Sequence, residues 1–145
     1  MGQITREQLE AYRSMQEEIR ELNYKLQHLG DDDTIMASST VNDYRSGYPV
    51  PQAVVGVDWD KMDRLYNRYT NRITKLKKEC ELIEDYIEGI DDSMTRRIFR
   101  FRFLEGLPLK IIEKNVHLDK SNISRKIENF LKSQRTQQTQ HYNNT

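Results

Sequence analysis

Two long stripes of apolar residues, spaced three or four positions apart, constrain the fold of this chain most. The first stripe consists of Leu9, Tyr12, Met15, Ile19, Leu22, Leu26 and Leu29, and the second of Met62, Leu65, Tyr69, Ile73, Leu76, Cys80, Ile83 and Ile87. This spacing is typical of helices whose apolar side is covered by another helix. The stripes predict long helices over residues 1–29 and 58–89.

Start and stop signals support both helices. Thr5 and Gln8 have the spacing of a capping box, and Asp58 is a suitable N-cap for the second helix. Gly30 and Gly89 are good stop residues. Two such helices predict an antiparallel, coiled-coil-like hairpin. The same stripes could pair between chains, so we also expect a homo-oligomer formed through the long helices.

Residues 30–57 have no helical period, and they contain three of the six glycines and two of the three prolines. We interpret this stretch as a flexible linker. The rest of the chain carries helical signals, so the predicted fold class is all-α.

Residues 91–132 predict a helix-turn-helix domain. An arginine-rich helix starts near Asp92 and stops at Gly106, and a short helix then runs from 108 to 116. After a three-residue turn, Asp119 can cap a second helix over 120–132. A short helix, a tight turn and a longer helix are the elements of a helix-turn-helix motif, in that order. The polar residues 133–145 are predicted to be a disordered tail.

The charges of the chain are separated along the sequence. Residues 1–92 hold 12 Lys and Arg against 19 Asp and Glu, whereas residues 93–145 hold 11 against 4. The basic end is therefore the expected contact with a polyanion. Arg and Asn can read base edges in the major groove, and Lys can hold phosphates. The candidate DNA-binding residues are Lys110, Lys120, Ser121, Asn122, Ser124, Arg125, Lys126 and Asn129.

The string RRIFRFRFLEGLPLKIIEKNVHLDKSNISRKIENFL resembles region 4 of sigma-70-type factors. The layout as a whole is similar to small phage-encoded regulators of late transcription of the RinA and ArpU type. The resemblance implies duplex DNA as partner, with RNA polymerase as a second, and residues 120–126 as the DNA-reading face. Two positions depart from the family pattern. Glu113 replaces a small residue, and His117 replaces a turn glycine whose left-handed conformation costs other residues about 1 kcal/mol.

The sequence gives no sign of an enzyme, a cofactor or a metal site. The three histidines lack metal spacing, the single Cys80 cannot build a usual zinc site, and no Gly-x-x-x-x-Gly-Lys phosphate loop occurs. No apolar run reaches the roughly 18 residues of a membrane span. A single cysteine suits a reducing compartment. Together with the resemblance, this predicts the cytoplasm of a bacterial host cell and no membrane partner.

Two alternatives to transcription regulation stay open. Small terminase subunits of phages also join a helix-turn-helix to oligomerising helices, although their helix-turn-helix commonly comes first in the chain. The chain could also be a helical interaction protein that does not bind DNA and uses the acidic hairpin as its working surface.

Overall fold

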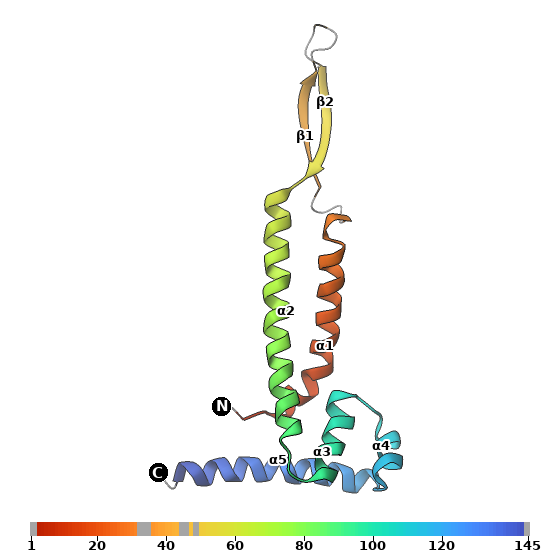
Figure 1. Cartoon of the computed structure of the whole chain (residues 1–145), viewed down its shortest axis with the longest axis vertical. Helices are drawn as coiled ribbons and strands as arrows, with labels where there is room; N and C mark the ends of the chain where they lie inside the picture. Colours follow the sequence, from red (N-terminus) through yellow and green to blue (C-terminus); the bar gives the residue numbers. More distant parts are fainter. Residues whose placement is uncertain (1–2, 32–35, 44–46, 48–49, 144–145) are drawn as a thin grey trace. The chain divides into compact units, whose positions relative to one another are not determined.

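The computed structural model describes residues 3–31, 36–43, 47 and 50–143 (Figure 1). The chain divides into two compact units: unit 1 contains Met1–Glu17 and Leu76–Thr145, and unit 2 contains Glu18–Lys75. The protein is mostly helical, which confirms that part of the predicted fold class. No helix of the described residues is long and apolar enough to cross a membrane.

The two long helices begin at the predicted caps. Helix α1 covers Arg6–Gln27, and the Thr5 N–H donates to Gln8 Oε1 at 2.8 Å while the Gln8 N–H donates to Thr5 Oγ1 at 3.2 Å. Helix α2 covers Trp59–Glu88, and Asp58 Oδ1 accepts from the Lys61 N–H at 3.1 Å. A short 3₁₀ turn, η1 (Leu29–Asp31), follows α1.

Unit 2 contains a β-hairpin where a flexible linker was expected. Strand β1 (Met36–Asp43) pairs antiparallel with β2 (Val50–Val57), from Met36 opposite Val57 to Asp43 opposite Val50. Strand β2 contains four valines and β1 contains Thr40 and Val41, and both residue types favour strands. Pro51 is tolerated because each strand of a two-stranded sheet has one unpaired edge. The chain is therefore not purely α-helical.

The helical part of unit 2 has a thin core. Ile19, Leu29 and Ile73 are its buried apolar side chains among the residues that the structure describes there. The Lys25 ammonium lies 5.7 Å from the centroid of the Tyr69 ring, which links α1 to α2 within the unit. The predicted stripes thus supply the buried residues of this unit.

Unit 1 contains the C-terminal helices. Helix α3 (Ser93–Phe99) leads into a π-helical turn, η3 (Arg100–Leu104), and α4 (Leu109–Val116) and α5 (Lys120–Asn143) follow. Helix α3 packs on both α4 and α5, and α4 packs on α5. The buried side chains of these elements are Thr95, Ile98, Phe99, Phe103, Ile112, Val116, Ile123, Ile127 and Leu131.

Two details of this region differ from the prediction. The spacing of Ile98, Phe101 and Leu104 predicts that they point inward, but Phe101 and Leu104 are only half-buried. Phe99 and Phe103 are buried instead. The π turn widens the helix after Phe99, and this changes which positions face the core. Residues 133–145 were predicted to be disordered, but α5 continues to Asn143, because the Gln-rich segment contains no helix breaker.

The long helices also contribute to the core of unit 1. Leu9 and Tyr12 from α1 are buried, as are Cys80, Ile83 and Ile87 from α2. Burial raises the pKa of the Cys80 thiol, a shift that the hydrogen bond with Gln16 partly opposes. Burial also raises the pKa of Tyr12 to about 12, and the negative charge of Glu84 adds to this shift. Cys80 is thus the small apolar core residue that its place on the stripe predicts.

Candidate nucleic-acid interface

The turn between α4 and α5 has a left-handed residue at its first position. His117 has φ 58° and ψ 38°, and its N–H donates to the Glu113 carbonyl at 2.8 Å. This is a position where glycine is the easiest residue to place. Glu113, the second position at which the sequence differs from the sigma region 4 pattern, is half-buried on α4. The turn therefore forms with His117 and Glu113 in place.

Helix α5 is capped and anchored where the sequence predicts. Asp119 Oδ1 accepts from the Asn122 N–H at 2.9 Å. Ile123 and Ile127 are 0% and 3% exposed, so one side of the helix is fixed against α3 and α4. A cap and a buried flank hold the first turns of α5 in one orientation.

The opposite side of α5 faces solvent. Asn122, Arg125 and Asn129 recur at steps of three and four, so they share one side of the helix. They are exposed, and the remaining exposed members of the predicted set are Lys110 on α4 and Lys120, Ser121 and Ser124 on α5. Seven of the eight predicted residues are therefore accessible to a large partner.

Lys126 differs from the rest of the predicted set. It is half-buried, and its charge helps to lower the pKa of Asp92 at the start of α3. The larger causes of that shift are the hydrogen bonds that Asp92 accepts from Thr95. Lys126 thus lies close enough to Asp92 to act on the start of α3.

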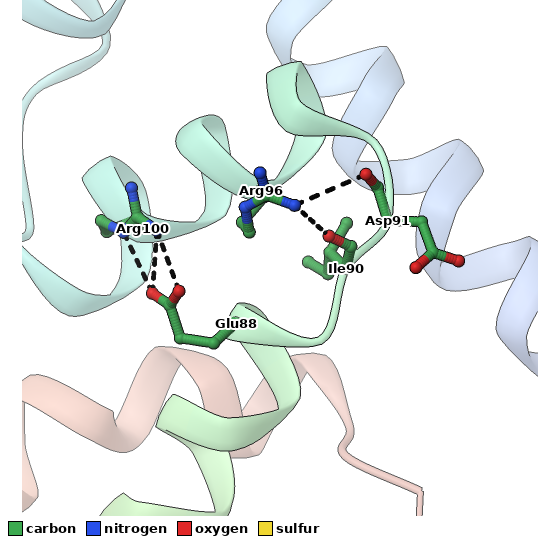
Figure 2. Close-up of polar contacts among 5 residues, drawn as sticks. All are labelled: Glu88, Ile90, Asp91, Arg96 and Arg100. Atoms are coloured by element: carbon green, nitrogen blue, oxygen red, sulfur yellow. Dashed lines mark hydrogen bonds and ion pairs between the residues drawn. The ribbon is translucent and has the colours of Figure 1, made fainter.

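Several arginines of α3 and η3 form hydrogen bonds and ion pairs with other parts of the protein. The Arg100 guanidinium donates to both carboxylate oxygens of Glu88 (Figure 2). The Nη2–Oε1 and Nη2–Oε2 distances are 2.9 and 3.1 Å. Arg96 donates to the Ile90 carbonyl at 2.6 Å (Figure 2), and Arg97 donates to the Asn115 carbonyl at 3.2 Å. These arginines join α2, α3 and α4, so they contribute less to an outer surface than the sequence suggests.

Helix α1 contributes two arginines to this region, which the sequence interpretation missed. Arg6 forms an ion pair with Glu128 on α5, and Arg13 donates to the Glu105 carbonyl at 2.6 Å. Glu128 is the one acidic residue between Lys120 and Thr145. Its pairing with Arg6 reduces the negative charge that Glu128 places on α5. No sequence pattern connects Arg6 to Glu128, because 122 positions separate them.

The lysines and arginines that are not paired in this way make the exposed side of α4 and α5 positively charged. Lys110, Lys114, Lys120 and Arg125 are exposed, and among the described residues no carboxylate pairs with any of them. They come from α4 and α5, the two helices of the predicted helix-turn-helix. The arrangement can offer Arg and Asn side chains to base edges and Lys side chains to phosphates.

The described residues contain no group of three or more His, Cys, Asp or Glu side chains placed to hold a metal ion. No family model, curated protein or solved structure matches this chain.

Proposed function

We propose that this chain is a sequence-specific duplex-DNA-binding protein that reads the major groove with residues 120–132. The observation that carries the proposal is the row of Asn122, Arg125 and Asn129, exposed on a capped helix whose opposite side is buried. A helix of this kind enters the major groove with its N-terminal residues toward the bases.

Each side chain has a distinct chemical task in this proposal. The Arg125 guanidinium would bind guanine O6 and N7, and the Asn122 amide would bind adenine N6 and N7. Lys110 and Lys120 would contact phosphates and set the position of the helix without reading sequence. Arg6 would support binding indirectly by neutralising Glu128.

We further propose that the chain regulates transcription, as a late-gene activator of a phage or prophage. The resemblance of residues 91–132 to sigma region 4 supports this role. The helices α1 and α2 would then form a homo-oligomer or contact RNA polymerase. Arg6 and Arg13 tie α1 to the helix-turn-helix, which gives the long helices a direct link to the proposed DNA-binding part.

The proposal is tested by titrating full-length protein with labelled duplexes that differ at single base pairs. Arg125→Ala should lose about 1–3 kcal/mol of discrimination at one base pair. Lys110→Ala should weaken binding to all sequences alike and lower the log–log salt slope by about 1. Arg20→Ala removes the same charge from an exposed site in unit 2 and should leave discrimination unchanged. If Arg125→Ala keeps the full discrimination, α5 does not read bases.

A further inference from the structure

Helix α2 carries a basic stretch that the acidic average of residues 1–92 hides. Between Arg64 and Lys78 there are six Lys and Arg and no Asp or Glu. Within unit 2, four of these cations recur at steps of four, four and three. Residues at such steps lie on one side of a helix. We call this row the α2 stripe, and it consists of Arg64, Arg68, Arg72 and Lys75.

The α2 stripe is open to solvent. All four side chains are exposed, and among the described residues no carboxylate forms an ion pair with any of them. Arg68, Arg72 and Lys75 line a shallow depression of about 310 Å³ together with Asn71. The lining thus consists of hydrogen-bond donors with positive charge and one amide.

This arrangement is unfavourable without a partner. Like charges three or four positions apart destabilise a helix by about 0.2–0.5 kcal/mol for each pair. An extended anion would remove that repulsion. Three of the four residues are arginines, whose planar fork matches phosphate oxygens.

The length of the stripe suits a nucleic-acid backbone. Arg64 and Lys75 are eleven residues apart, which is about 16 Å along a helix at 1.5 Å per residue. Duplex DNA carries one negative charge for about every 1.7 Å of its axis. A duplex therefore presents several phosphates over the same distance, whereas a small anion would occupy only one or two of the cations.

We propose that the α2 stripe is a second, sequence-independent binding surface for the phosphates of duplex DNA. The inference extends the proposed DNA-binding function, but it requires only phosphates and no base reading by α5. The inference gives a function to the basic part of α2. The α2 stripe belongs to unit 2, whereas α5 belongs to unit 1.

The test uses full-length protein and a duplex of random sequence, titrated between about 50 and 200 mM salt. Removing two phosphate contacts with Arg68→Gln and Arg72→Gln should reduce the log–log salt slope by about 1.8, at about 0.9 for each phosphate. The control variant combines Arg20→Gln with Lys77→Gln, which removes the same charge from exposed positions outside the stripe. Its slope should stay close to that of the parent protein. Arg68→Lys with Arg72→Lys keeps the charge and should restore most of the slope.

Three results would overturn the inference. Equal loss of slope in the stripe variant and the control would mean that only net charge matters. An unchanged slope in the stripe variant would mean that the stripe does not contact DNA. Loss of self-association in sedimentation, with DNA binding intact, would identify a second copy of the chain as the partner.

The same measurements separate this inference from the proposed function. Asn122→Ala with Arg125→Ala should abolish preference among sequences but retain the salt-dependent binding of random duplex through the stripe. If that variant keeps its sequence preference, the proposal for α5 fails while the result for α2 stands. If the Asn122→Ala, Arg125→Ala variant loses its sequence preference and the stripe variant keeps the full salt slope, only the inference on α2 fails.

Discussion

Gly106 provides a quantitative test of how α1 is held against the turn that follows η3 in unit 1. Its φ is 66°, a left-handed value that costs other residues about 1–2 kcal/mol. A Cβ at this position would lie 2.8 Å from Arg13 Cζ and closer still to Cδ and Nε. Gly106→Ala therefore strains the backbone and also displaces the Arg13 side chain.

The displacement of Arg13 has its own cost. The guanidinium donates to the Glu105 carbonyl at 2.6 Å, and loss of this solvent-exposed hydrogen bond should cost about 1 kcal/mol. We therefore expect Gly106→Ala to lower the free energy of unfolding by about 2–3 kcal/mol in total. In an Arg13→Ala background the same change should cost only the backbone strain, about 1–2 kcal/mol.

Urea unfolding of the parent, the two single variants and the double variant measures both terms. The coupling energy of the cycle should be about 1 kcal/mol. The reasoning is refuted if Gly106→Ala costs less than about 0.5 kcal/mol, or if its cost is the same in both backgrounds.

Two further predictions concern single side chains of unit 1. Because the pKa of Tyr12 rises from 10 to about 12 on folding, the folded protein holds this proton more tightly. The contribution of this shift to stability is therefore complete below pH 10, and about 2–3 kcal/mol is lost as the pH rises toward 12. Tyr12→Phe should make the free energy of unfolding less dependent on pH in this window. An unchanged pH profile in the variant would contradict the assignment to Tyr12. Glu88→Gln breaks the surface pair with Arg100 and should cost at most about 1 kcal/mol, less at high salt; a larger, salt-independent loss would show that the pair is not screened.

Local signals predicted the starts of the helices well. Thr5, Asp58 and Asp119 each accept the hydrogen bonds that their positions predict. Such caps act within a few residues, so the sequence alone contains the necessary information. The burial of Ile123 and Ile127 was also predictable, because their spacing follows the helical period.

Features that depend on distant contacts were not predictable. The ion pair of Arg6 with Glu128 and the fork of Arg100 on Glu88 require the folded arrangement. The β-hairpin was missed because Gly and Pro were interpreted as breakers, although four of the eight residues of β2 are valines. The α2 stripe was missed for a different reason: charge was averaged over 92 residues, and the 19 acidic residues of that range outweighed the stripe.

Selection of bound sequences from a pool of random duplexes, with the full-length protein, tests the central claim most directly. The account predicts an enriched motif, with a guanine or adenine at positions whose preference disappears in the Arg125→Ala or Asn122→Ala variant. For a dimer, two half-sites about one helical turn apart should emerge. A pool that stays random after selection, or a motif that both variants still enrich, would contradict the claim that α5 reads DNA.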